Sequence, residues 1–319
     1  MRPAHLLLLI VMNAFWAGTY SAFKGLAPHL DAGALATLRY SLAAGLLGVC
    51  WPWLPGSAPR GQDFLRTVVM GVIVFCFAPR LQVAGVQLGG ATDAAVLMAL
   101  EPLVTSIAAA WFLRERIGPR RWIGFGLGLL GVLVMAEVWR PDFRLPGLWA
   151  NALFLSSFAC EAAYSVMGKP LLGRWGMARV VTVALLSGSL ANLVWEGPAA
   201  WHAAMALPVE GWWVMLYLSV ICTVIGYVAW FYVIREAEVN VAVLTVFLQP
   251  VLGVLIAAVA LGERPHWGHL WGSLVILLGV GIGLSRQIRL PGRAGAGQQC
   301  GATGVTGGEA GASPGAGHG

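Results

Sequence analysis

Residues 94–104 read A-A-V-L-M-A-L-E-P-L-V, and residues 242–252 read A-V-L-T-V-F-L-Q-P-V-L. Each stretch places a proline, Pro102 or Pro250, inside an apolar run, and the two prolines lie 148 positions apart (250 − 102). The similarity continues without a gap: L-R-E-R at 113–116 matches L-G-E-R at 261–264, and G-x-x-x-x-L-L-G-V begins at Gly124 and again at Gly272. The chain therefore contains an internal repeat with an interrupted helix in each copy.

The composition is that of a protein that crosses a membrane many times. Hydrophobic residues make up 58% of the chain and charged residues 11%, whereas a water-soluble domain usually carries about 25% charged residues. Lipid forces backbone polar groups to pair within each span, so the spans must be helices. Apolar runs predict ten of them, at residues 6–23, 34–54, 67–86, 93–113, 122–139, 148–167, 178–196, 211–232, 240–261 and 270–286.

The repeat divides the predicted spans into two groups of five. We expect a first five-helix repeat at 4–139, a second at 146–286, and a disordered Gly-rich cytoplasmic tail at 287–319. Because five is an odd number, the second repeat should be inverted in the membrane relative to the first. The sequence thus predicts an all-α membrane protein of ten transmembrane helices in two inverted repeats.

The distribution of basic residues predicts the orientation. With the N-terminus in the cytoplasm, four of the 20 Lys and Arg residues fall in outer loops and two, Arg39 and Arg80, fall within spans. The other 14 fall in cytoplasmic segments, which favours both termini inside; the family resemblance described below implies the cytoplasmic (inner) membrane. Since these residues are spread over short loops and not gathered on one face, we expect no nucleic-acid partner.

Together these motifs resemble the drug/metabolite transporter superfamily, specifically its ten-helix EamA-type members. The resemblance covers about residues 4–286 and rests on the proline motifs, the L-x-E-R that follows each, the paired G-x-x-x-x-L-L-G-V, the aromatic end of the first span, and Arg39. It implies export or exchange of small molecules across the cytoplasmic membrane, with helices from both halves lining one central cavity. The sequence departs from the family pattern at Ala78–Gln82, A-P-R-L-Q, which puts Pro79 and Arg80 in the membrane.

The two prolines are candidate helix breaks. Each proline removes one backbone donor, which would leave the carbonyl four residues earlier, at Met98 or Val246, without its partner. Such a carbonyl is tolerated at membrane depth only where protein or a wet cavity satisfies it. A kink that serves packing alone remains the alternative.

Carboxyl groups within spans are candidates for proton coupling. Glu101 and Gln249 precede the two prolines at matched positions, and Glu161 lies in the sixth predicted span with Tyr164 and Ser165 at helical spacing. A charged side chain at mid-membrane costs roughly 2.5–3.5 kcal/mol, so we expect Glu101 to face the interior and to pair with Arg80. Either this pair only fixes the packing, or Arg80 binds a substrate carboxylate while Glu101 or Glu161 carries a proton.

Aromatic and polar side chains form two stripes that suit a cavity wall. Asn13, Trp16 and Tyr20 share one helix face, and Tyr227 and Trp230 share another. A cavity with aromatic walls and few polar groups would suit a small amphipathic molecule. The predicted substrate-binding residues are Asn13, Trp16, Tyr20, Arg80, Met98, Glu101, Tyr164, Tyr227, Trp230 and Gln249.

Several chemistries leave no signature in this sequence. It contains no phosphate-binding G-x-x-x-x-G-K-[ST], no H-E-x-x-H, no C-x-x-C and no nucleophile elbow. We therefore expect no enzymatic activity, no cofactor and no metal. The sequence favours a secondary transporter that exports small organic metabolites such as amino acids by alternating access at a midplane cavity. Export of drugs or nucleotide-type metabolites, a non-transporting scaffold or sensor subunit, and a homodimer are left open.

Overall fold

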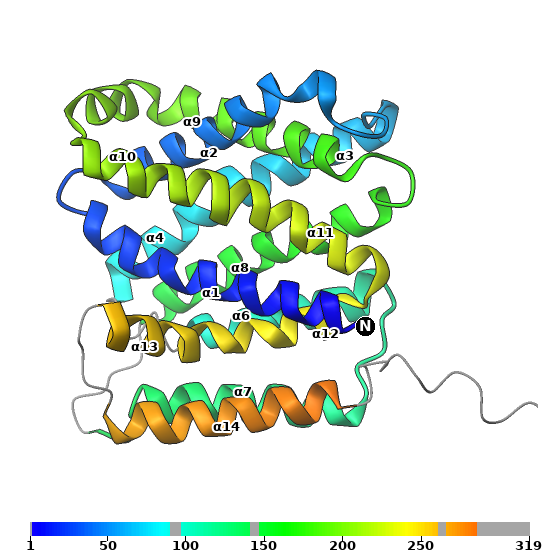
Figure 1. Cartoon of the computed structure of the whole chain (residues 1–319), viewed down its shortest axis with the longest axis vertical. Coiled ribbons are helices and arrows are strands. Elements are labelled where there is room, and N and C mark those ends of the chain that lie inside the picture. Colours follow the sequence, from blue (N-terminus) through cyan, green and yellow to red (C-terminus); the bar gives the residue numbers. More distant parts are fainter. Residues whose placement is uncertain (1, 90–96, 141–146, 261–265, 286–319) are drawn as a thin grey trace, which may run out of the picture.

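The computed structural model describes residues 2–89, 97–140, 147–260 and 266–285, and all regular secondary structure in these ranges is helical. The first half runs through α1 (Pro3–Leu26), α2 (Ala32–Val49), α3 (Gly61–Val72), α4 (Ala78–Gly89), α6 (Glu101–Phe112) and α7 (Pro119–Met135). The second half runs through α8 (Leu148–Gly168), α9 (Met177–Ala206), α10 (Val209–Leu216), α11 (Gly226–Glu236), α12 (Val239–Ala242), α13 (Leu248–Ala260) and α14 (Trp267–Leu284). Figure 1 shows how they stack.

Many of these helices have the length and the apolar composition of membrane spans. Seven qualify, and a shorter apolar helix covers Met98–Phe112. The seven are Pro3–Phe23, Ala32–Val49, Gly61–Gly85, Met177–Ala206, Val209–Glu236, Val239–Ile256 and Trp267–Leu284. Large apolar side chains such as Val194 and Trp195 remain exposed on the outside, as a lipid-facing surface requires. The all-α membrane fold is confirmed, while the count of ten spans stays a prediction.

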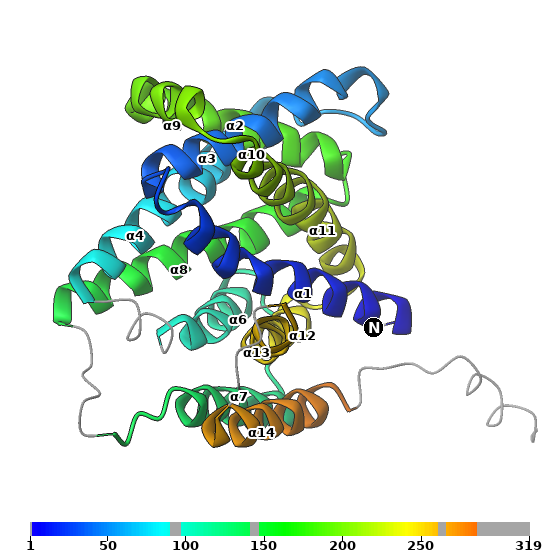
Figure 2. The same ribbon diagram turned by 60° about the vertical axis from the view of Figure 1, so that its left-hand side comes forward.

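The internal repeat is visible in the last helix of each half. Helices α7 and α14 begin 148 residues apart, at Pro119 and Trp267, and lie side by side along their length (Figures 1 and 2). A Cβ atom at Gly131 would lie 2.7 Å from the carbonyl oxygen of Gly272, and one at Gly124 would lie 2.9 Å from that of Gly279. Only glycine permits backbones to approach this closely. Since 124 and 131 correspond to 272 and 279 in the repeat, the contact is self-complementary.

The proline segments differ from the prediction in one respect. Each proline lies in the first turn of an α-helix, α6 or α13, and a 3₁₀ segment precedes it at Met98–Leu100 or Val243–Phe247. The Glu101 N–H donates to the Met98 carbonyl, and the Leu248 N–H donates to the carbonyls of Thr245 and Val246. The prediction that Met98 and Val246 hold unpaired carbonyls is therefore wrong, because the tighter 3₁₀ turn brings in a nearer donor.

A second irregularity, which the sequence analysis did not predict, recurs in both halves. A π-helical segment joins α3 to α4 at Ile73–Phe77, and another joins α10 to α11 at Tyr217–Ile225. A π-helix leaves backbone carbonyls that need other donors, and the Asn192 side-chain amide supplies one to the Phe75 carbonyl at 2.7 Å. Such segments often lie at functional sites. Both continue into helices that supply residues to the site described below.

Candidate substrate-binding site

The two halves enclose a cavity of about 430 Å³. Residues from α1, α2, α4, α6, α8, α11 and the 3₁₀–α13 segment line it, so helices of both repeats contribute. Seven of the ten predicted substrate-binding residues are among the lining residues: Trp16, Met98, Glu101, Tyr164, Tyr227, Trp230 and Gln249. The predicted proton-coupling residue Glu161 lines it as well.

One wall of the cavity is aromatic. The Trp16 ring lies 6.3 Å from that of Tyr227 and 6.0 Å from that of Trp230, and the Tyr164 and Tyr227 rings are 4.8 Å apart. The polar tips of this wall have protein partners. The Trp16 Nε1 donates to the Cys222 carbonyl at 2.9 Å, and the Trp230 Nε1 donates to the Ser165 Oγ at 2.9 Å. Because these donors are satisfied, the rings present apolar faces to an occupant.

A pair of amides joins α1 to α13 behind this cavity. Asn13 is fully buried, and its Nδ2 donates to the Leu9 carbonyl at 2.8 Å and to the Thr245 Oγ1 at 3.1 Å. The Gln249 Nε2 donates to the Asn13 Oδ1 at 3.0 Å. Asn13 is not among the lining residues, so it positions Gln249 and does not itself meet the cavity.

A pair of carboxyl groups joins α6 to α8. Glu101 and Glu161 both line the cavity and lie close enough to interact with one another. The repeat relates this pair to the amide pair, because 161 − 13 and 249 − 101 both equal 148. The match between Glu101 and Gln249 is evident beside the two prolines, whereas the match between Asn13 and Glu161 was not predicted, although the same offset relates them.

Arg80 lies elsewhere than predicted. Its guanidinium is 3.7 Å from the Glu196 carboxylate and stacks 4.8 Å from the Trp195 ring, and both partners belong to α9. The predicted ion pair between Arg80 and Glu101 is therefore wrong, and Arg80 is not among the described residues that line the cavity. Its neighbour Pro79 faces the cavity instead. The side chain of Tyr20 lies outside what the structure describes.

Other residues that line the cavity were not among the predicted site residues. The most polar is Arg39 of α2, which stands out in the sequence as one of two basic residues inside a predicted span. Some of the others follow the predicted residues at helical spacing, so extending each predicted helix face by one turn would have found them. The residues missed include Thr19, Phe23, Arg39, Tyr40, Gln82 and Thr105.

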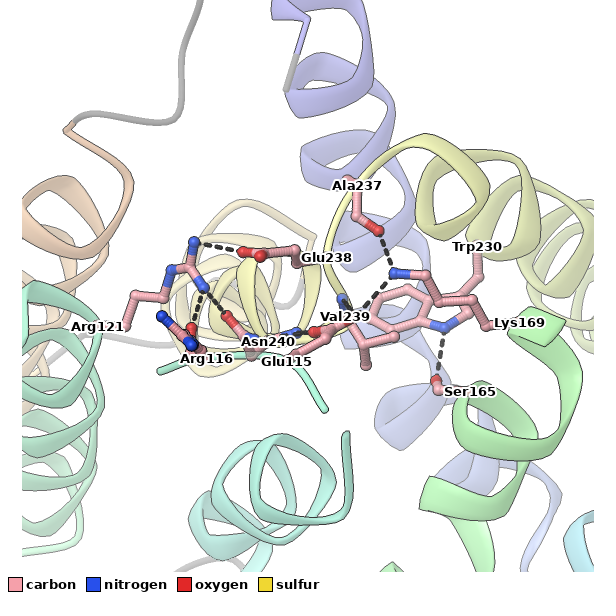
Figure 3. Close-up of polar contacts among 10 residues, drawn as sticks. All are labelled: Glu115, Arg116, Arg121, Ser165, Lys169, Trp230, Ala237, Glu238, Val239 and Asn240. Carbon is pink, nitrogen blue, oxygen red and sulfur yellow. Dashed lines mark hydrogen bonds and ion pairs between the residues drawn. The ribbon is translucent and has the colours of Figure 1, made fainter. Parts of the chain in front are cut away.

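A network of polar contacts, here called the Glu115 network, ties together the end of the molecule where α6 finishes (Figure 3). The Glu115 carboxylate accepts from the Lys169 Nζ at 2.7 Å, the Val239 N–H at 2.9 Å and the Asn240 Nδ2 at 2.8 Å. It also accepts from the Asn240 N–H at 3.1 Å. A carboxylate at the N-terminus of a helix, here α12, is favoured by the unpaired N–H groups and the helix dipole.

The same network extends to α7 and α11. The Lys169 Nζ also donates to the Ala237 carbonyl at 2.7 Å, and Arg121 donates to the Asn240 Oδ1 and pairs with Glu238 at 2.5 Å. Lys169 follows Ser165, the partner of Trp230, by one helical turn, so the network begins directly beyond the aromatic wall. The network therefore lies beyond the end of the cavity that Ser165 and Trp230 line. On the opposite side, lining residues at Ala27–Ala32 reach the connection between α1 and α2.

The chain is similar in sequence to proteins named as transporters. The chain is 27% identical over 290 residues to an "Uncharacterized transporter" of Archaeoglobus fulgidus, covering 89% of this chain and 98% of that protein. It is 26% identical to a "Probable terminal-alkyne amino-acid exporter" of Streptantibioticus cattleyicolor, covering 89% and 97%. It is 25% identical to a "Probable amino-acid metabolite efflux pump" of Salmonella typhimurium, covering 88% and 94%.

The fold is also shared with a solved structure. A crystal structure superposes with a TM-score of 0.72 at 15% sequence identity, covering 88% of this chain and 96% of the other. The model of the EamA-like transporter family matches residues 4–136 and again residues 148–284, once for each half. The chain therefore belongs to the EamA-like transporter family, as an integral membrane protein built of two repeats.

Proposed function

We propose that the protein is a secondary transporter that exports small organic metabolites, with amino acids first among them. The observation that carries this proposal is the cavity itself, which combines an aromatic wall, a carboxyl pair and one guanidinium and is lined by helices of both halves. A scaffold subunit has no use for charged groups at membrane depth, since each is costly to bury there. The names of two relatives, an amino-acid exporter and an amino-acid metabolite efflux pump, support the substrate class.

The asymmetry of the cavity supports alternating access as the proposed mechanism. We place the N-terminus in the cytoplasm on the charge distribution, and Arg2, next to the start of α1, pairs with Glu236 at 3.2 Å beside the Glu115 network. The end beside the Glu115 network is then cytoplasmic and, on this proposal, closed, and the side reached by Ala27–Ala32 is external. On this proposal the described state faces outward. Export requires the Glu115 network to open so that substrate enters from the cytoplasm.

The carboxyl pair is the proposed site of proton coupling. Two neighbouring carboxylates repel each other when both are ionised, which favours a proton on the pair. Arg39, Tyr40 and Tyr227 face this pair from α2 and α11 and set the local field. Binding of a cationic ammonium group would favour release of that proton, and this is the exchange that a proton-linked exporter needs.

The test is counterflow in proteoliposomes loaded with unlabelled amino acids, nucleosides or cationic drugs, followed by entry of a labelled amino acid with and without a pH gradient. We expect exchange of amino acids that a pH gradient biases, and Glu101→Gln to remove the bias while exchange remains. If only nucleosides or only drugs were exchanged, that class would replace amino acids as the proposed substrates. If folded protein exchanged none of the compounds, the result would support the alternative of a non-transporting scaffold subunit.

A further inference from the structure

Arg39 is the one lysine or arginine among the described residues that line the cavity. It is 8% exposed and therefore buried, and its Nε donates to the Thr223 Oγ1 at 2.8 Å. The Thr223 hydroxyl in turn donates to the Leu218 carbonyl at 2.8 Å within the π-helical segment. Because that hydrogen is already used, the Thr223 oxygen is left as an acceptor for Arg39. The guanidinium is thus held in one orientation by α2 and the irregular helix together.

The rest of the guanidinium lacks a protein acceptor. An arginine carries five N–H donors, and no described residue accepts from the two terminal NH₂ groups of Arg39. No described Asp or Glu makes an ion pair with it either, although Glu161 lies close enough to interact electrostatically. Its flanks are aromatic, with the Tyr40 ring 5.4 Å and the Phe23 ring 5.9 Å from its central carbon. A buried guanidinium that lines a cavity and has unused N–H donors is suited to bind an anion.

We propose that Arg39 binds the carboxylate of the substrate, and that the substrates are α-amino acids with apolar side chains. This inference rests on the proposed function and names the recognition groups for it. The substrate ammonium would point to Glu101 and Glu161, and the side chain would lie along the wall formed by Trp16, Tyr227 and Trp230. A planar guanidinium matches a carboxylate with two parallel hydrogen bonds, which a lysine could not form.

The same geometry disfavours other substrate classes. A nucleotide or another dianion would bring two negative charges toward one guanidinium and the carboxyl pair. A simple amine would meet the carboxyl pair but would offer no carboxylate to the terminal NH₂ groups of Arg39, so it would forgo the charge-assisted hydrogen bonds there. Of the small amphipathic molecules, a zwitterion can pair with both Arg39 and the carboxyl pair.

The experiment compares three ligands that share one ring system. Phenylalanine carries both charged groups, phenethylamine lacks the carboxylate, and 3-phenylpropionate lacks the ammonium. Their ability to compete with labelled phenylalanine in counterflow, and their binding to purified wild-type protein by calorimetry, should rank phenylalanine first. The Arg39→Gln variant should bind phenylalanine about 10- to 100-fold more weakly than wild-type protein does, while its affinity for phenethylamine is unchanged. The affinity of Arg39→Lys for phenylalanine should be intermediate, because lysine keeps the positive charge but cannot form the two parallel hydrogen bonds of a guanidinium.

Arg235→Gln is the matched control, since it removes one arginine charge from the exposed last turn of α11. It should leave the ranking of the three ligands unchanged. If Arg39→Gln fails to fold, Arg39→Lys and the wild-type ranking still decide. Equal binding of phenylalanine and phenethylamine by wild-type protein, or equal weakening of both in the Arg39 variants, would overturn the assignment. Failure of the proposed function would look different, because wild-type protein would then exchange none of the three.

Discussion

At the scale of single residues, the two repeats place different chemistry at equivalent positions. Asn13 and Gln249 form an amide pair, whereas Glu161 and Glu101 form a carboxyl pair. Both pairs join the first helix of one half to the proline helix of the other. Amides do not titrate in the physiological range, and carboxyl groups do. Of these two connections between the halves, the carboxyl pair can therefore carry the proposed proton, and the amide pair cannot.

The double variant Glu101→Gln with Glu161→Asn tests this difference. It gives the carboxyl pair the side chains of the amide pair, which are joined by a hydrogen bond, so the protein should fold. We expect amino-acid exchange to continue while a pH gradient no longer biases it, as measured by counterflow at matched and unmatched pH. Asn13→Asp is a useful comparison, because it adds a carboxyl group outside the cavity lining. Persistent bias in the double variant would place the proton site elsewhere.

Most of the site could be predicted because intramembrane polar residues and aromatic stripes follow helical spacing. Seven of the ten predicted side chains line the cavity for this reason. Arg80 was misplaced because its partners, Trp195 and Glu196, come from α9, and the sequence does not show which helix packs against which. Arg39 was not selected for the same reason: its anchor, Thr223, depends on a π-helical segment that has no signature in the sequence.

At the scale of helices, packing between α7 and α14 depends on glycine. A Cβ atom at Gly131 would lie 2.5 Å from the Ile276 Cγ1 and 2.7 Å from the Gly272 carbonyl oxygen. The backbone of α14 would have to move away to make room for it, with loss of contact along both helices. Gly126 of the same helix has no neighbour within 4 Å of its Cβ position.

Gly131→Val should therefore destabilise the protein, and Gly126→Val should not. Overpacking of this kind costs about 1–3 kcal/mol or more, and we expect a clear fall in the unfolding temperature followed by tryptophan fluorescence in detergent. The two variants add the same side chain to the same helix, so any effect of valine itself cancels. Equal unfolding temperatures for both would show that α7 and α14 are not held by this contact.

The sequence predicted the repeats, the proline helices and the aromatic stripes, but it did not predict which segments are 3₁₀- or π-helical. Pro102 and Pro250 were expected within helices, whereas each lies in a first turn after a 3₁₀ segment. The two π-helical segments depend on distant donors such as Asn192, which lies in another helix. Hydrophobic periodicity reports on burial and span length, and it carries no information about such long-range hydrogen bonds.

At the scale of the whole molecule, the Glu115 network should control access from the cytoplasm. Glu115→Gln keeps the size of the side chain but removes the negative charge that holds Lys169 and the start of α12. We expect the variant to favour the inward-facing state. A cysteine introduced at Thr105, which lines the cavity, should then react faster with an impermeant thiol reagent applied from the cytoplasmic side.

This labelling requires a background in which the native cysteines are replaced. Glu210→Gln is the control, because Glu210 is exposed in the first turn of α10 and is not part of the network. It should leave the labelling rate as it is in the parent protein. Faster labelling from the external side in Glu115→Gln would reverse the proposed orientation, and no change on either side would remove the network as the closure.

The self-complementary contact between α7 and α14 also bears on how the two halves came to differ. Neither helix contributes a residue to the cavity, yet each presents the same glycine surface to the other, as two identical subunits do across a two-fold axis. A half-length chain would form such a contact with a second copy of itself, and every substitution in it would appear twice. Once one chain carries both copies, that constraint disappears. Position 101 can then be acidic while its counterpart at 249 is an amide, so the proposed proton site occurs once where a homodimer would have two.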